Sequence, residues 1–293
     1  MEVEQKLTNG LHQSKVEGVV ASIVTFNPDV DLLKKNIRSI ENQVEEVIVV
    51  DNNSENIKAI ECLVSKLSNT YIIKNKNNEG IAYALNQACE YAYAKGFKWN
   101  LTLDQDSICN QNFVSCLYNI SKSIINPGIV APIIIDRNVG VIGHAPSDEL
   151  EYKEVRTCIT SGALTNLLAW NTINGFDNKM FIDSVDFDFC YRLRKNNFKV
   201  VQCPNVKLNH SIGDAKRLRF LFFHFNNTEH SAFRDFYIAQ NSIYYPKKNR
   251  MVLRLIRGNF RNIKLILVVL IYEKNKVEKI NSIVRGWKNG YKL

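Results

Sequence analysis

The chain has 293 residues, of which 45% are hydrophobic and 23% charged, so it is long enough for one large α/β domain or a domain with a helical appendage. Its seven cysteines include no Cys-x-x-Cys pair, so we expect reduced packing residues of a cytoplasmic protein, not a disulfide framework or a zinc site. Because the segment 1–15 is polar and of mixed charge, we expect it to be neither a signal nor a transit peptide. The longest uncharged apolar run near the C-terminus, 265–272, is far shorter than the roughly 20 residues that span a bilayer.

The net charge of +9 is distributed unevenly along the chain. Residues 247–293 carry 13 Lys/Arg and 2 Glu, whereas the preceding residues carry 25 Lys/Arg and 27 Asp/Glu. A nearly neutral body argues against binding of nucleic acid. A basic tail predicts contact with an anionic partner.

In the first half of the chain, apolar β-branched runs alternate with segments whose apolar residues recur at helical spacing. This alternation indicates an α/β fold, with a mostly parallel sheet and helices on both faces. No Gly-x-Gly-x-x-Gly follows the first strand and no P-loop motif occurs, so neither of those nucleotide sites is expected. We expect strands at 19–25, 47–50, 71–73, 98–103 and 129–135, and helices at 29–40, 54–67, 77–93 and 110–124.

The second half is less regular. The small residues Ser161, Gly162 and Ala163 would let a backbone approach a ligand closely. We expect strands at 155–160, 198–202 and 206–209, and a helix from Arg234 onward. The run that starts at Phe181 enters a helix that begins near Asp186 and ends at Lys195, and two tail helices are separated near Lys274 and Asn275.

Two aspartates, Asp104 and Asp106, follow the strand at 98–103 with one residue between them. Side chains at this spacing share one face of a strand, and two close carboxylates repel each other unless a cation or proton lies between them. A hard divalent metal carrying phosphate oxygens is one interpretation, and a surface turn is the other. Polar residues also end the strands before Asn27 and Asn53. Because parallel strands end at one edge of a sheet, these three clusters predict one ligand site.

With these motifs in view, the chain resembles the inverting family-2 glycosyltransferases of the GT-A fold, and within them the bacterial rhamnosyltransferase branch. This resemblance implies a glycosyltransferase domain at 1–246, with a Rossmann-like nucleotide-binding half at about 18–135 and an acceptor half at about 136–246. A basic amphipathic helical tail would occupy 247–293. The matching segments are Thr25–Pro28, Val50–Ser54, Asn78–Ala82, Leu103–Ser107, Val185–Asp188 with Arg192, and Arg234–Asn241.

The resemblance also implies residues for the donor site. Asp51 would hydrogen-bond the nucleotide base, and Thr25 and Asn27 would lie beside the base and ribose. Gly80 would border the nucleotide at a helix N-terminus, which favours an anionic group, although a plain helix start explains Gly80 alone. The remaining implied donor-binding residues are Asn53, Asn78, Asp104, Gln105 and Arg234.

A divalent metal, Mn²⁺ or Mg²⁺, is implied as the cofactor. Asp104 and Asp106 match the family's metal-linked pair, with Asp106 as the direct ligand. His210 matches a histidine that completes the metal site in many relatives, and a neutral imidazole suits manganese better than magnesium. The alternative for His210 is a structural role.

Asp186 matches the family's general base, which takes a proton from the acceptor hydroxyl as it attacks the anomeric carbon. A helix N-cap is the alternative role. Many relatives have an acidic residue directly before the base, whereas this chain has Val185, so Asp183 and Asp188 stay open as alternatives. Arg192, one helical turn from Asp188, would hold that carboxylate in place.

Arg234, Tyr237 and Asn241 share one helical face. Either this face helps to close the site over the diphosphate or acceptor, or it is an aromatic stripe packed on the body.

The resemblance implies dTDP-L-rhamnose as the donor and a glycan or lipid-linked glycan of bacterial surface polysaccharide synthesis as the acceptor. Another nucleotide-sugar, such as a UDP-hexose or UDP-galactofuranose, is an alternative donor, and a scaffold without catalysis is an alternative function. A sugar-phosphate nucleotidyltransferase is not expected, because residues 25–28 are neither glycine-rich nor basic.

Basic residues alternate with Leu, Ile and Val at helical spacing in 251–272, which is typical of a helix on a membrane surface. Together with the lipid-linked acceptors that the resemblance implies, this pattern leads us to expect peripheral attachment to the inner face of the bacterial cytoplasmic membrane. Packing of this helix on the body and a contact within a homo-oligomer are the alternatives.

Overall fold

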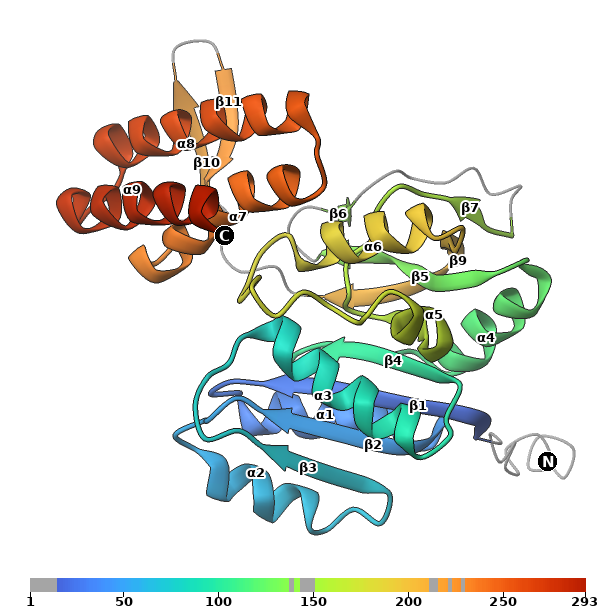
Figure 1. The fold of residues 1–293 in the computed structure, drawn as a ribbon. Helices are drawn as coiled ribbons and strands as arrows, with labels where there is room; N and C mark the ends of the chain where they lie inside the picture. Colours follow the sequence, from blue (N-terminus) through green and yellow to red (C-terminus); the bar gives the residue numbers. More distant parts are fainter. Residues whose placement is uncertain (1–14, 137–139, 143–150, 211–215, 221–222, 228–229) are drawn as a thin grey trace, which may run out of the picture.

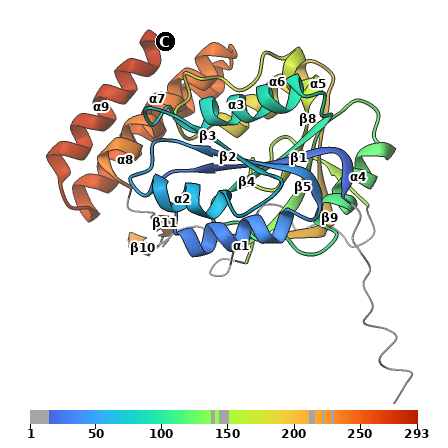
Figure 2. The same cartoon turned by 90° about the horizontal axis from the view of Figure 1, so that it is seen from below.

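The computed structural model of the protein describes residues 15–136, 140–142, 151–210, 216–220, 223–227 and 230–293. Its centre is one sheet in the order β3-β2-β1-β4-β8-β5-β9-β7, with β6 paired to β5 (Figure 1). Helices cover both faces of this sheet (Figure 2). The expected α/β architecture is therefore confirmed.

The first half forms a parallel sheet in which strands and helices alternate, as its sequence pattern predicts. Alternate residues of the first strand point to opposite faces, so Val19 and Ala21 join one hydrophobic core and Val20 joins the other. The elements are β1 (Val16–Thr25), α1 (Val30–Ile40), β2 (Val44–Asp51), α2 (Ile57–Val64), β3 (Thr70–Lys74), α3 (Ile81–Ala94), β4 (Trp99–Asp104) and α4 (Phe113–Ser123).

The second half extends this sheet. β5 (Pro127–Asp136) and β9 (Lys199–His210) are parallel to each other, and β8 (Ala163–Asn166) runs antiparallel between β4 and β5. β1 to β5 and β9 therefore point the same way, and their carboxyl ends share one edge. β6 (Gly140–Ile142) and β7 (Lys153–Glu154) add short antiparallel partners.

Two strand predictions in this half are wrong. Residues 155–160 form no strand, because the backbone turns there, with the Ala163 N–H donating to the Thr160 carbonyl at 3.1 Å, and the chain enters β8 at Ala163. The strands predicted at 198–202 and 206–209 are one strand, β9. Its register against β5 shifts after Cys203, so the residues between the two segments are absorbed without ending the strand.

The second half also contains helices. α5 (Leu167–Thr172) was not expected from the sequence pattern. α6 (Val185–Lys195) begins next to Asp186, where the sequence predicts a helix start. Asp183 and Ser184 precede it with positive φ angles of 65° and 62°, which are not helical. The hairpin β10 (Lys216–Phe220) and β11 (Phe223–Asn227) was likewise not expected.

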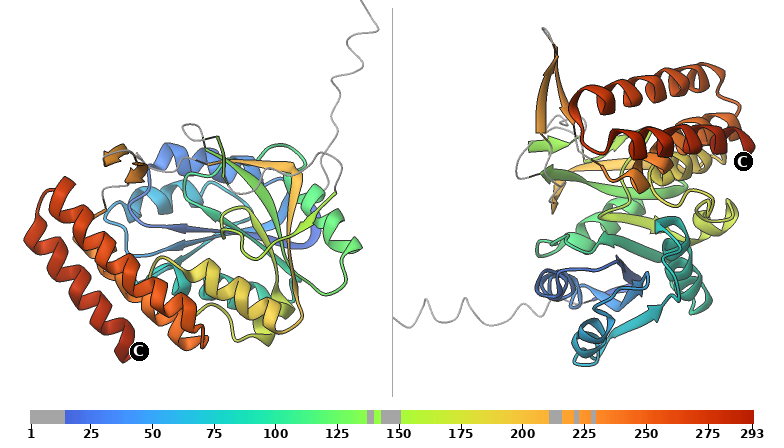
Figure 3. Two further views of the ribbon diagram at one scale, coloured as in Figure 1. Left: turned by 90° about the horizontal axis from the view of Figure 1, so that it is seen from above. Right: turned by 90° about the vertical axis from the view of Figure 1, so that its left-hand side faces the viewer.

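The C-terminal helices α7 (Ala232–Lys248), α8 (Val252–Tyr272) and α9 (Lys276–Lys292) pack together beside the sheet (Figure 3). α8 ends at Tyr272 and α9 begins at Lys276, so the predicted break near Lys274 and Asn275 is confirmed. Gly286 of α9 lies against the Phe236 carbonyl of α7, where a side chain has no room. None of the helices in the described part of the chain is long and apolar enough to cross a membrane.

Candidate functional site

The carboxyl ends of β1 and β2 are joined by buried hydrogen bonds. The Thr25 hydroxyl donates to Asp51 Oδ1 at 2.9 Å, and the Ser54 hydroxyl donates to the same oxygen at 2.5 Å. The backbone N–H of Ser54 donates to Asp51 Oδ2 at 2.9 Å. The Asp51 carboxylate is therefore held rigidly at the sheet edge where the sequence predicts a ligand site.

The loops after three strands are also connected. Asn27 and Asn53 both have left-handed backbones, with φ of 48° and 66°, and both are exposed. Asn27 accepts a hydrogen bond from the Glu55 N–H at 2.8 Å. Gln105 Oε1 accepts from the Phe26 N–H at 2.9 Å, which links the loop after β4 to the loop after β1. These residues therefore form one continuous surface.

Asp104 and Asp106 lie at the end of β4, and both are partly buried. The backbone N–H of Asp104 donates to Ser161 Oγ at 3.3 Å. Ser161 Oγ also lies 2.8 Å from Ser107 Oγ. The sequence singled out Ser161 only as a small residue, and its position against β4 depends on the antiparallel β8.

The acidic pair fits a hard divalent cation, because carboxylate oxygens are the ligands that Mg²⁺ and Mn²⁺ prefer. Within the described residues, no group of three or more His, Cys, Asp or Glu side chains forms a metal cluster. The backbone of His210 ends β9 opposite Asp136 in the register, but its side chain lies outside the described part. The metal-ligand set therefore stays a prediction.

Gly80 connects the two halves of the protein. Its φ of 86° is left-handed, and a Cβ there would lie 2.5 Å from the Phe181 carbonyl oxygen. That carbonyl accepts from the Ile81 N–H at 2.7 Å, so the first amide of α3 is bonded within the protein. Asn78 Oδ1 accepts from the Gly80 N–H at 3.1 Å. Gly80 is thus required for the close approach of the loop before α6.

Asp186 is the second residue of α6 and lines a cavity of 550 Å³. Burial, with a smaller contribution from the negative charges of Asp183 and Asp104, raises the pKa of this carboxyl to about 6, against hydrogen bonds from backbone N–H groups that lower it. Asp186 is not the N-cap, which is Ser184. We call this space the base cavity; its wall also includes Arg156, Thr157, Cys158, Ser161 and Phe187.

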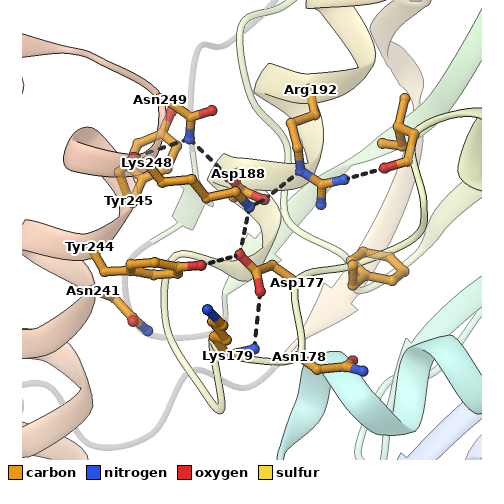
Figure 4. A network of polar contacts seen from close by, with 12 residues as sticks. Asp177, Asn178, Lys179, Asp188, Arg192, Asn241, Tyr244, Tyr245, Lys248 and Asn249 are labelled. Atoms are coloured by element: carbon orange, nitrogen blue, oxygen red, sulfur yellow. Dashed lines mark hydrogen bonds and ion pairs between the residues drawn. The ribbon is translucent and has the colours of Figure 1, made fainter. Parts of the chain in front are cut away.

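Asp188, an alternative base in the sequence, has a different environment (Figure 4). Its carboxylate is fully buried and accepts from Arg192 Nε at 2.6 Å, Lys248 Nζ at 3.0 Å and Asn249 Nδ2 at 2.9 Å. The expectation that Arg192 holds Asp188 is confirmed. Lys248 also pairs with Asp177 at 2.5 Å. Asp188 therefore joins α6 to α7, and the sequence gives no local signal for its distant partners.

Asp183, the other alternative base, is paired with Arg234, whose Nη2 lies 3.3 Å from Asp183 Oδ1. The buried side chain of Asn241 donates to the carbonyls of Ile182 and Asp183 at 2.8 Å each. Tyr237 stacks on Phe181 with ring centroids 4.7 Å apart. One face of α7 thus combines aromatic packing with polar contacts to the loop that precedes Asp186.

Comparisons with known proteins agree with this arrangement. The family model "Glycosyl transferase family 2" matches residues 21–175, slightly more than half of the chain. The dTDP-rhamnosyl transferase RfbF of Shigella flexneri is 27% identical over 287 residues, which are 93% of this chain and 95% of that protein.

Two solved structures share the fold. S. aureus TarS 1-349 in complex with UDP-GlcNAc is 14% identical, with a TM-score of 0.60, over 90% of this chain and 79% of that chain. The mannosyltransferase PcManGT from Pyrobaculum calidifontis, in complex with GDP-Man and Mn²⁺, is 12% identical, with a TM-score of 0.55, over 100% of this chain and 81% of that chain. The expected GT-A fold is confirmed.

Replacing Asp188 tests whether this residue stabilises the fold more than Asp186 does. We expect Asp188→Asn to lower the free energy of unfolding by about 3–5 kcal/mol, because the change leaves the cationic Arg192 and Lys248 without their buried partner. Denaturation by urea measures this loss. Asp186→Asn is the matched control and should change stability far less. Equal stability of the two variants would contradict a structural role for Asp188.

Proposed function

Because the chain belongs to glycosyltransferase family 2, we propose that it transfers a sugar from a nucleotide-sugar to a glycan hydroxyl, with inversion at the anomeric carbon. The observation that carries this proposal is the position of Asp186 on the wall of the base cavity, near the charge of Asp104. Asp188 and Asp183 are paired with cationic side chains, which leaves Asp186 as the carboxyl suited to proton transfer.

The donor would lie along the carboxyl ends of β1, β2 and β4. Asp51, held by Thr25 and Ser54, would accept hydrogen bonds from the nucleotide base. Asn27 and Gln105 belong to the connected loops that would border the ribose and diphosphate. Asn53, Asn78, Gly80 and Arg234 complete the proposed donor site.

In the proposed reaction, Asp186 in its ionised form accepts the proton of the acceptor hydroxyl as the hydroxyl oxygen attacks the anomeric carbon. One displacement then breaks the bond to the nucleoside diphosphate and inverts the configuration. Mn²⁺ or Mg²⁺, held by Asp104 and Asp106 with His210, would supply charge neutralisation at the diphosphate. Arg234 and Asn241 would keep the loop before Asp186 in place.

We propose dTDP-L-rhamnose as the donor and a bacterial surface polysaccharide, such as O-antigen, capsule or cell-wall glycan, as the product. The 27% identity to a dTDP-rhamnosyl transferase supports this choice. A uridine sugar is the second candidate, because UDP-GlcNAc is bound in the S. aureus structure.

Donor and metal can be tested together by thermal shift. We expect dTDP-L-rhamnose with Mn²⁺ to raise the melting temperature of the wild type, because a ligand that binds only the folded state stabilises it. The shift should disappear without Mn²⁺ and in Asp106→Ala. The same Mn²⁺-dependent shift with a UDP-sugar alone would overturn the choice of rhamnose. A folded protein that responds to none of the donors would favour the scaffold alternative.

The role of Asp186 predicts a pH dependence. A base must be ionised, and its pKa of about 6 means that kcat/KM should fall about tenfold per unit as the pH drops below 6. Asp186→Asn should lose turnover by roughly 10²-fold or more while keeping the donor-induced thermal shift. Steady-state kinetics between pH 5 and 8 would measure both effects. Full turnover by Asp186→Asn would rule out this residue as the base.

We also propose that α8 lies on an anionic membrane surface. Its outer face exposes apolar side chains at alternating spacings of three and four residues, which form one continuous stripe. Arg254, Arg257, Arg261 and Lys264 follow the same helix and are exposed. Each basic residue near an anionic leaflet contributes about 1 kcal/mol. The stripe consists of Leu253, Ile256, Phe260, Ile263, Leu267 and Leu270.

Vesicle binding tests this surface. Leu253, Phe260 and Leu267 are 74%, 67% and 51% exposed, so changing all three to Ser should leave the fold intact. We expect this triple variant to lose most of its sedimentation with phosphatidylglycerol vesicles, because apolar contact with the bilayer is removed. Ile125→Ser, at an 81% exposed position on α4's C-terminal side, is the control. If the stripe instead mediates dimerisation, the wild type will sediment as a dimer without vesicles and the triple variant as a monomer.

A further inference from the structure

A second cavity, of 460 Å³, lies between α8, the end of α7 and the segment after β7. We call it the arginine pocket because, among the described residues, its lining contains four arginines and no acidic side chain. Three of the arginines lie on successive turns of α8, and the fourth lies before β8, almost a hundred residues earlier in the chain. The arginines are Arg156, Arg254, Arg257 and Arg261.

Among the residues that the structure describes, no carboxylate neutralises these guanidinium groups. Arg254 donates to the Tyr245 hydroxyl at 3.0 Å, which is a neutral partner. Throughout the part of the chain that the structure describes, Arg156, Arg257 and Arg261 have no carboxylate within ion-pair distance. Four positive charges around one concave surface repel each other and create a strong local field that an anion would stabilise. Arginine also presents a planar fork of donors that matches phosphate oxygens.

The arginine pocket adjoins the base cavity. Arg156, Thr157 and Phe187 line both, and Ser184 of the pocket lies two residues before Asp186. None of the strand-end residues proposed for the donor lines this pocket. An anion bound there would therefore occupy a place separate from that proposed for the donor diphosphate, next to the cavity that Asp186 lines.

We propose that the arginine pocket binds a phosphate or diphosphate group of the acceptor and so places the acceptor hydroxyl at Asp186. This inference rests on the proposed function and adds the substrate class, a glycan linked to phosphate. The phosphate can come from a soluble glycosyl phosphate or from a lipid-linked glycan. The apolar stripe lies on the same helix as three of the arginines. In a lipid-linked acceptor, the lipid chain would contact the stripe and the phosphate would contact the arginines.

Direct binding tests the pocket independently of catalysis. The probes are inorganic pyrophosphate and a short-chain prenyl diphosphate, measured by calorimetry in EDTA without donor, so that the metal-dependent donor site does not contribute. We expect both to bind the wild type and to bind Arg257→Gln/Arg261→Gln roughly tenfold or more weakly. Arg285→Gln/Lys288→Gln, on the exposed face of α9, removes the same charge elsewhere and should bind like the wild type. Equal weakening in both double variants, or no binding to the wild type, would overturn the proposal.

Transfer kinetics then link the pocket to the acceptor. With matched acceptors that carry or lack the phosphate, the pocket variant should show roughly a tenfold higher KM for the phosphorylated acceptor only, with kcat nearly unchanged. The donor-induced thermal shift should persist in this variant. An equal loss with both acceptors would refute a phosphate subsite.

Together, the binding and transfer measurements distinguish failure of the proposed function from failure of the acceptor role of the pocket. They also identify the source of the phosphate. A wild type that binds pyrophosphate but transfers no sugar would overturn the proposed function, and with it the acceptor role of the pocket. A pocket variant that loses binding to phosphatidylglycerol vesicles but keeps its KM would assign the pocket to a membrane phospholipid and overturn the acceptor role. Preference for prenyl diphosphate over pyrophosphate would identify the lipid-linked source.

Discussion

The buried carboxylate of Asp188 is the interaction on which the arrangement of the second half depends. Arg192 shares its helix, whereas Lys248 and Asn249 come from the end of α7 and the residue after it. A buried anion is tolerated only when it is paired and hydrogen-bonded, so these contacts require α6 and α7 to stay together. Asp186 lies half a turn from this anchor, and α8 follows α7 directly. One buried charge therefore fixes both the base cavity and the basic helix beside it.

The site combines opposite electrostatic environments within a short distance. In the base cavity, the charges of Asp104 and Asp183 reinforce the effect of burial and raise the pKa of Asp186. Phe187 also lines the arginine pocket, whose described lining residues include four arginines and no acidic side chain. A cation would be favoured in the first environment and an anion in the second. This polarity suits a reaction between two substrates that enter from different sides.

The strand-end cluster could be predicted because its signals are local. Apolar runs ending in Thr25, Asp51 and Asp104 indicate parallel strands, and parallel strands must end at one edge. The prediction of a strand at 155–160 is wrong. The apolar content of this segment resembles that of a strand, but its backbone turns before β8, and that turn depends on the position of β8 in the sheet. Lys248 and Asp188 are far apart in the sequence, and so are Arg156 and the arginines of α8. No local sequence pattern could therefore predict either of these contacts.

The sequence by itself determined the α/β class, the polar strand ends, the helical spacing of the tail and the excess of positive charge there. Each depends on periodicity or composition over a few neighbouring residues. Only the tertiary structure decided which of Asp183, Asp186 and Asp188 faces a cavity, because that depends on cationic partners from α7. It also decided that the arginines of α8 lie beside Arg156, next to the base cavity. Burial and long-range pairing change the chemistry of a side chain, and the folded chain alone specifies them.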